Sequence, residues 1–168
     1  MPSITHNESP QIKIQLVDPH QIIVWAIRHL LSSDQRYQIC AVAANSKEAL
    51  ELAASSKPDV IVLEPELNEG DGVEIIPALI SKSSAKVIVF TGSRNASIQD
   101  KAVVKGARGV VNKSEPVEIL LKAIEKIHGG ELWLNRNATS RILLQIAQAN
   151  SPKEMSSEEK KLKSLTLK

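Results

Sequence analysis

Five short apolar segments, each followed by a helix-like stretch, constrain the fold of this chain more than any other feature. The segments are 12–17, 38–43, 59–63, 86–90 and 108–111. Apolar residues follow one another in them instead of alternating with polar residues, which is typical of parallel strands covered on both faces. Helices are predicted at 20–32, 46–56, 72–82, 95–106 and 115–128. Five such units predict a doubly wound α/β fold with an open parallel sheet and right-handed crossovers.

The composition of the 168-residue chain narrows the class of protein. Hydrophobic residues make up 42% and charged residues 24% of the chain, which is enough for a full core. A net charge of +2 is too small to indicate a nucleic-acid partner for the chain as a whole. The single cysteine, Cys40, excludes an internal disulfide framework. We find no signal peptide and no apolar run long enough for a membrane span, so a cytoplasmic protein is expected.

Polar side chains stand where four of the predicted strands end. Asp18 follows the first strand and Glu64 the third, while Thr91 and Lys113 follow the fourth and fifth. In a doubly wound sheet, the carboxyl ends of the strands beside the switch point form the ligand crevice. Two acids, a hydroxyl and an amine gathered in one crevice would suit phosphoryl chemistry.

The pattern along the chain predicts the domain boundaries. Residues 12–130 form the predicted α/β domain, and residues 1–11 are expected to be a disordered tail. Residues 131–164 are predicted to be a linker with one helix near 138–149, because 151–164 are polar, charged and Ser-rich. Residues 165–168 turn apolar again, and sequence order alone leaves a frayed tail as one interpretation of them.

The chain resembles the receiver domain of response regulators in the NarL/FixJ (LuxR-type) branch, from about residue 12 to 134. Four stretches carry the resemblance: LVDPH at 16–20, AANSKEALELAASSKPDVIVLE at 43–64, VIVFTG at 87–92, and GARGVVNKSEPVEILLKAIEKIHGGELWL at 106–134. The last stretch is the most specific, because Gly-Ala-Arg-Gly, the Lys-Ser pair and the following helix occur in register. The resemblance implies a flavodoxin-like fold with strand order 2-1-3-4-5.

The resemblance also implies roles for the crevice residues. Asp18 and position 19 would hold Mg²⁺, and Glu64 would stand at the phosphoacceptor position. Thr91 would be the switch hydroxyl and Lys113 the counter-charge to the phosphate. In this branch a helix-turn-helix domain follows the linker and opens with Leu-Thr-x-Arg-Glu, and residues 165–168 (LTLK) sit where that opening is expected. We therefore expect DNA to bind through a C-terminal domain not present in this chain.

Four departures from the family pattern weaken the expected chemistry. Pro19 offers Mg²⁺ no side-chain oxygen, and Glu64 carries its carboxylate one methylene further than the usual aspartate. A displacement of roughly 1 Å can cost ~100-fold in positioned chemistry. In the family, an aromatic side chain at the position of Val110 usually changes its rotamer in response to the switch hydroxyl, which a valine cannot do. Asn68 stands where the family has a proline. We therefore predict a phosphorylation-independent receiver that is not an enzyme and has no cofactor or metal.

The sequence leaves more than one role open for the Glu64 carboxylate. Its carboxylate could stand in for a phosphoryl group and hold an active-like arrangement, although it carries −1 where a phosphoryl group brings about −1.5 to −2. It could also form a plain ion pair with Lys113, which we favour. A weak Mg²⁺ site at Asp18, Glu64 and Glu66 is a further alternative, as is conventional phosphorylation despite Glu64.

The sequence also predicts an interaction surface on the first helix and two kinds of partner. Helical spacing points Trp25 outward, next to Ile22 and His29. Exposed tryptophan is enriched in interfaces, and family receivers often pair through their first and fifth helices, so a homodimer is expected. A histidine kinase or another protein is a second expected partner. The competing hypothesis is a stand-alone interaction module without DNA binding. A flavodoxin-like redox enzyme is disfavoured, because no phosphate-cradling turn follows the first strand.

Overall fold

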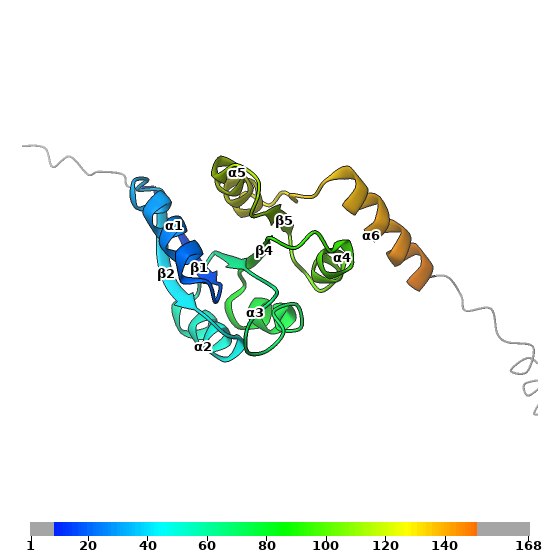
Figure 1. Cartoon of the computed structure of the whole chain (residues 1–168), viewed down its shortest axis with the longest axis horizontal. Helices are drawn as coiled ribbons and strands as arrows, with labels where there is room; N and C mark the ends of the chain where they lie inside the picture. Colours follow the sequence, from blue (N-terminus) through cyan, green and yellow to red (C-terminus); the bar gives the residue numbers. More distant parts are fainter. Residues whose placement is uncertain (1–8, 151–168) are drawn as a thin grey trace, which may run out of the picture.

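A five-stranded parallel sheet in the order β2-β1-β3-β4-β5 lies at the centre of the protein (Figure 1). The structure is a computed structural model, and it describes residues 9–150. The strands are β1 (Ile12–Val17), β2 (Tyr37–Ala43), β3 (Val60–Leu63), β4 (Lys86–Thr91) and β5 (Gly109–Asn112). The predicted flavodoxin-like α/β fold and its strand order are confirmed.

Two layers of helices cover the sheet. One layer contains α1 (Gln21–Ser32) and α5 (Val117–His128), whose buried residues Ile27, Leu31 and Ile124 pack with Ile14 and Leu16 of β1. The opposite face is covered by α2 (Ser46–Ser56), α3 (Ile76–Ser83) and α4 (Ala96–Val104). Helices therefore shield both faces of the sheet from solvent, which explains why the strand sequences are continuously apolar.

The start of the third helix differs most from the prediction. The third helix was expected at 72–82, but α3 begins at Ile76, because the Asp71 carboxylate accepts the Val73 N–H in a turn before it. Pro77 therefore lies in the first turn of α3, where no intrahelical N–H is needed, and not at an internal bend. On α1, Ile27 and Leu31 are the buried residues, and Leu30 is partly buried.

The segment after α5 extends the edge of the sheet and leads into a sixth helix, α6 (Arg136–Ala149). Trp133 donates its N–H to Arg108 O at 3.0 Å and accepts the Val110 N–H at 3.0 Å, so it pairs alongside β5. A Cβ at Gly109 would lie 3.0 Å from the Trp133 Cβ and 2.5 Å from Ile127 Cδ1, so this close approach requires glycine. Trp133 thus covers the exposed edge of the sheet.

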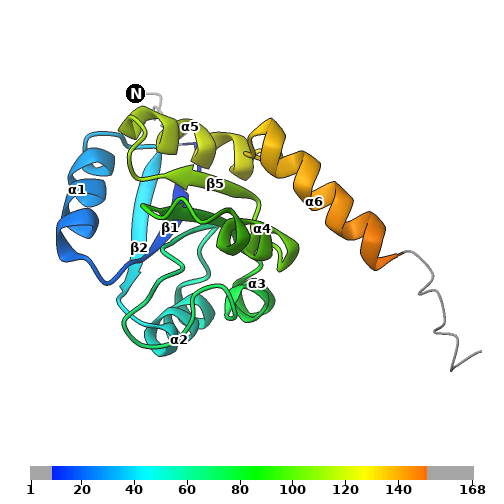
Figure 2. The ribbon, with the colours of Figure 1, turned by 45° about the vertical axis from the view of Figure 1, so that its right-hand side comes forward.

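The sixth helix lies beside α4 (Figure 2). Arg141 contacts the Asp100 carboxylate through two nitrogens, at 2.8 and 3.0 Å, and Asp100 is only 4% exposed. The predicted linker helix at 138–149 is present and begins two residues earlier, at Arg136. The predicted tail at 1–11 falls mainly, and the predicted helix-turn-helix start at 165–168 entirely, outside the described residues.

Candidate functional site

The carboxyl ends of four strands bring Asp18, Glu64, Thr91 and Lys113 together. The backbone ladder continues one residue beyond the strands: Asp18 N–H donates to Ala43 O, Glu64 N–H to Val17 O, and Lys113 N–H to Thr91 O, at 2.8 to 3.0 Å. Each side chain is therefore positioned by its neighbouring strand and not by a flexible loop. Asp18, Glu64 and Thr91 are buried, and the Lys113 side chain is 14% exposed.

One ammonium group joins the two buried acids. Lys113 Nζ lies 2.7 Å from Asp18 Oδ2 and 2.8 Å from Glu64 Oε2. Both carboxylates are about 95% buried, so each one needs a paired charge to remain ionised at low cost. We call Asp18, Glu64 and Lys113 the acid–lysine triad.

The remaining carboxylate oxygens of the triad also have partners. Glu64 Oε1 accepts the Thr91 hydroxyl at 3.1 Å and the Glu66 N–H at 3.0 Å. Asp18 Oδ1 accepts the His20 N–H at 2.8 Å, and His20 Nδ1 lies 2.9 Å from the same oxygen. All four oxygens are thus occupied by hydrogen-bond partners from the chain itself.

The triad raises the pKa of Lys113. Burial alone lowers this pKa, because it disfavours the ammonium, but the hydrogen bonds to Asp18 and Glu64 outweigh burial and raise it above the ordinary value. Lys113 is therefore fully charged at neutral pH and is a permanent counter-ion to both acids.

The donor set does not fit Mg²⁺. This ion requires near-octahedral oxygen ligands, usually one or two carboxylates with waters and phosphate. Pro19 contributes no side-chain oxygen, and the oxygens of Asp18 and Glu64 face Lys113, His20 and Thr91. Within residues 9–150, no group of three or more His, Cys, Asp or Glu side chains is arranged to hold a metal ion. The contacts of the crevice are therefore those of the acid–lysine triad and its hydrogen-bond partners.

Val110, which replaces the family's aromatic switch residue, lies apart from the triad. Val110 is on β5, partly buried, and lines a separate pocket together with Gln99 of α4 and Trp133. Glu66 is exposed and lines the same pocket as Glu64, Thr91 and Lys113, and its backbone N–H donates to Glu64. The structure thus gathers Asp18, Glu64, Thr91 and Lys113 with Glu66 lining the same crevice, whereas Val110 lies outside it.

The surface predicted for dimerisation is exposed. Trp25 is 62% and Ile22 70% exposed on α1. The Trp25 ring stacks on His29 with the centroids 5.5 Å apart and the planes 9° from parallel. The indole therefore lies against the His29 ring on the exposed face of α1.

Among the helices within residues 9–150, none has the length and apolarity needed to cross a membrane.

Sequence reasoning missed the contacts that complete the site. His20 follows Asp18 by two residues, the spacing at which an aspartate side chain accepts a backbone N–H, so this contact could have been predicted. The Glu66 N–H contact to Glu64 has the same two-residue spacing. The pairing of Trp133 with β5 and the Arg141–Asp100 ion pair have no local sequence signal.

Comparison with known proteins defines the class. The sequence model of the response regulator receiver domain matches residues 14–125, so the chain belongs to the response regulator receiver family. The nitrate/nitrite response regulator protein NarL of Escherichia coli is 30% identical over 86% of this chain. This chain spans 66% of the length of NarL. The family consists of signalling regulators, and the relatives belong to its NarL/LuxR branch.

Solved structures agree with this class. A two-component response regulator of the LuxR family from Aurantimonas sp. SI85-9A1 is 28% identical, with a TM-score of 0.71, and the match covers 82% of this chain and 99% of that one. RcsB from Salmonella enterica serovar Typhimurium, bound to promoter rprA, has a TM-score of 0.68 at 22% identity, covering 86% of this chain and 73% of that one. At that identity, the likeness to RcsB shows the fold alone.

Proposed function

We propose that this chain is the receiver domain of a LuxR/NarL-type transcriptional regulator that works without phosphorylation. The observation that carries the proposal is the closed acid–lysine triad, in which Glu64, at the phosphoacceptor position, is bonded to Lys113 and Thr91. An acceptor carboxylate must be free to attack a phosphodonor. Here the attack would first break contacts of a buried acid and leave Lys113 paired with Asp18 alone.

Charge supports the same proposal. Two carboxylates and one ammonium give the crevice a net charge of −1, and a phosphodonor is itself an anion. Conventional receivers need a divalent cation to bring the two together, because positioning and charge neutralisation dominate phosphoryl transfer. Since the donor set around Asp18 and Pro19 does not fit Mg²⁺, the crevice repels the donor.

Acetyl phosphate tests this proposal. We expect the unaltered chain to keep its mass when incubated with acetyl phosphate and Mg²⁺, as measured by intact mass spectrometry. An added phosphoryl group that is lost in the Glu64→Gln variant would instead support conventional phosphorylation at Glu64. The same measurement on a conventional receiver shows that the donor is active.

A second role for Glu64 is supported by its contact with Thr91. A carboxylate that accepts the Thr91 hydroxyl and the Lys113 ammonium occupies the position in which the oxygens of a phosphoryl group would be bound. Glu64 would then hold the domain permanently in one arrangement. We favour the ion-pair role for its energetics, because a single carboxylate offers less charge and fewer oxygens than a phosphoryl group.

The output function is proposed from the relatives. RcsB is described as dimers bound to DNA, and the chain spans only part of its NarL relative. We propose that the whole protein binds DNA through a C-terminal helix-turn-helix domain and that the receiver controls this binding by dimerisation or by contact with a partner such as a histidine kinase. The competing function is a stand-alone interaction module. A reading frame that continues beyond Lys168 into a helix-turn-helix would exclude it.

The stacked Trp25–His29 pair supports a dimer surface on α1. If Trp25 is an interface anchor, Trp25→Ala weakens self-association at least ~5-fold, because truncated aromatic anchors cost more than about 1 kcal/mol. Sedimentation equilibrium over a concentration series measures this constant. Leu132→Ala is the control, since Leu132 is 61% exposed and lies outside α1. Equal self-association of both variants and the unaltered chain would contradict the α1 interface.

A further inference from the structure

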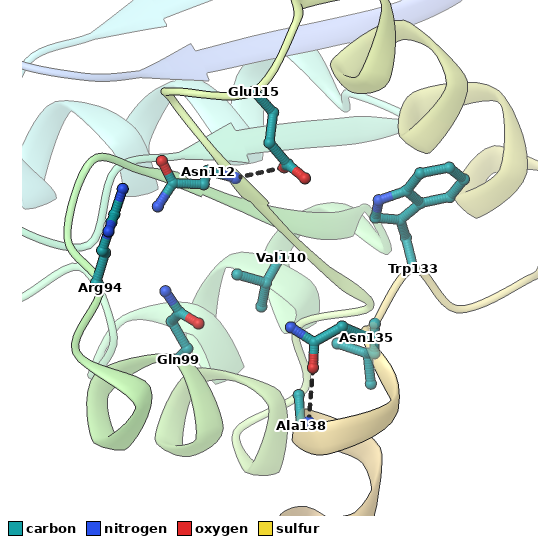
Figure 3. Close-up of a pocket in the computed structure, with 9 residues that line it drawn as sticks. Arg94, Gln99, Val110, Asn112, Glu115, Trp133, Asn135 and Ala138 are labelled. Carbon is teal, nitrogen blue, oxygen red and sulfur yellow. Dashed lines mark hydrogen bonds between the residues drawn. The ribbon is translucent and has the colours of Figure 1, made fainter.

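We infer that a second pocket of this protein, which no residue of the triad lines, binds a small molecule of the α-amino acid class. This β5–α6 pocket has a volume of about 450 Å³, within the range of small-molecule sites. It lies between β5, the start of α4, the loop before α5 and the segment that leads into α6 (Figure 3). Its lining residues that enter the argument are Arg94, Gln99, Val110, Asn112, Glu115 and Trp133.

The floor of the pocket is apolar. Val110 stands at its centre, with Trp133 on one side, and Leu134 and Ala138 complete the apolar lining (Figure 3). The pocket exists because position 110 carries a small side chain, and an aromatic ring there would occupy the space. An apolar ligand side chain of moderate size therefore fits against Val110 and the indole of Trp133.

Hydrogen-bond donors without partners lie on two sides of this floor (Figure 3). Among residues 9–150, the Arg94 guanidinium has no hydrogen-bond or ion-pair partner. Asn112 Oδ1 accepts the N–H and the hydroxyl of Ser114, at 2.8 and 2.7 Å, so the Asn112 amide NH₂ is left to donate. Asn135 Oδ1 accepts the Ala138 N–H at 2.7 Å, and its NH₂ points into the pocket (Figure 3). Arg94 and Asn112 lie on the same side of the pocket and together suit a carboxylate (Figure 3).

Acceptors also line the pocket, Glu115 from the loop before α5 and Gln99 from α4 (Figure 3). Glu115 Oε2 accepts the Asn112 N–H at 3.0 Å, which fixes the carboxylate at the rim while its other oxygen has no partner within the described chain. Gln99 Nε2 donates to Ser93 O at 3.0 Å, so Gln99 Oε1 is left as an acceptor. A carboxylate and an amide oxygen suit an ammonium group.

The two charges decide the class of ligand. Arg94 and Glu115 line one pocket but form no ion pair with each other within residues 9–150. A simple anion would be repelled by Glu115, and a simple cation by Arg94. A ligand that carries a carboxylate beside an ammonium, with an apolar side chain, satisfies both charges and the floor. A free α-amino acid is the simplest molecule of this kind.

The position of the pocket suggests what binding would change. Arg94 and Gln99 come from the α4 side of the pocket, Val110 from the sheet, and Trp133 from the segment that leads into α6. A bound amino acid would bridge these elements and strengthen the contact between α6 and α4 that Arg141 and Asp100 already make. Because no residue of the acid–lysine triad lines this pocket, the inference does not depend on how Glu64 functions.

Binding can be measured on the chain as it exists. The twenty standard L-amino acids are screened by thermal shift at 5 mM, and hits are titrated by isothermal titration calorimetry. We expect apolar or aromatic members to bind with a Kd on the order of 0.1 to 1 mM, the range for ligands of about ten heavy atoms. In the Trp25→Phe variant, Trp133 is the single tryptophan, so L-leucine binding also shifts the fluorescence of this residue.

Matched probes and variants identify the pocket. For L-phenylalanine we expect at least tenfold weaker binding of 3-phenylpropionate and of 2-phenylethylamine, which each lack one charge. Arg94→Gln and Glu115→Gln each weaken amino acid binding at least tenfold, Val110→Phe abolishes it, and Arg28→Gln on α1 leaves it unchanged. The inference is overturned if no amino acid binds saturably, or if binding is equal in the unaltered chain and in folded Arg94→Gln and Val110→Phe variants.

Discussion

Lys113→Met is expected to destabilise the protein by roughly 3 kcal/mol at pH 8, the size seen when one partner of a buried ion pair is removed. Asp18 and Glu64 each place an oxygen within 2.8 Å of the same ammonium, so the variant leaves two buried carboxylates facing each other. For a chain of this length the melting temperature should fall by roughly 5–10 °C. Thermal and urea unfolding followed by circular dichroism measure both quantities.

Two further variants distinguish charge loss from lost packing. Adding Glu64→Gln to Lys113→Met removes one of the unpaired charges and should restore most of the stability, which a double-mutant cycle measures. Lys105→Met is the matched control, because Lys105 pairs at 3.2 Å with the half-exposed Glu74, and such pairs contribute about 0–1 kcal/mol. Equal losses in Lys113→Met and Lys105→Met would contradict the electrostatic role of the triad.

The pH dependence of the free energy of unfolding provides a further test of the stabilising role of Lys113. Its pKa is raised in the folded state, so its contribution is fully present below the unfolded value of about 10.4 and is lost as pH rises through the folded value. Burial raises the pKa of Tyr37 to about 12, which adds to the same alkaline decline. The decline should therefore be smaller, but still present, in Lys113→Met.

The Pro19→Asp, Glu64→Asp double reversion is expected to convert the crevice into a working phosphoacceptor site. Aspartate at position 19 supplies the missing metal carboxylate, and the shorter side chain at position 64 moves the acceptor away from Lys113. We expect the rate of modification by acetyl phosphate in Mg²⁺ to rise at least ~100-fold above that of the unaltered chain. Time-resolved intact mass spectrometry measures this rate.

The two single reversions show whether both changes are needed. Pro19→Asp should gain Mg²⁺ affinity without efficient phosphorylation, because Glu64 still pairs with Lys113. Glu64→Asp should remain slow, because the metal shell is still incomplete. A double reversion that binds Mg²⁺ but accepts no phosphoryl group would mean that features beyond positions 19 and 64, such as Val110 or Asn68, also block the chemistry.

Local patterns in the sequence predicted most of the fold and the centre of the site. The five apolar runs gave the strands within one residue at each end, and in a parallel sheet strand ends fix which side chains meet. Asp18, Glu64, Thr91 and Lys113 could therefore be placed together without coordinates. The start of α3 was less predictable, because the turn at Asp71 competes with the helix through a side-chain hydrogen bond.

Contacts between distant segments could not be predicted in the same way. Arg141 and Asp100 are separated by 41 residues, and each looks like an ordinary surface charge in sequence. The β5–α6 pocket depends on Trp133 pairing with Gly109 and on α6 lying against α4. No periodic pattern within either segment carries this information, because it depends on tertiary packing.

Isothermal titration calorimetry of the unaltered chain with Mg²⁺ and beryllofluoride, a phosphoryl analogue, tests the closed triad most directly. If Lys113 and the two acids already satisfy one another, we expect no saturable heat at micromolar to low millimolar Mg²⁺, whereas the Pro19→Asp, Glu64→Asp chain should bind. Saturable binding in the micromolar range by the unaltered chain, lost when Glu64 is replaced by Gln, would contradict the account.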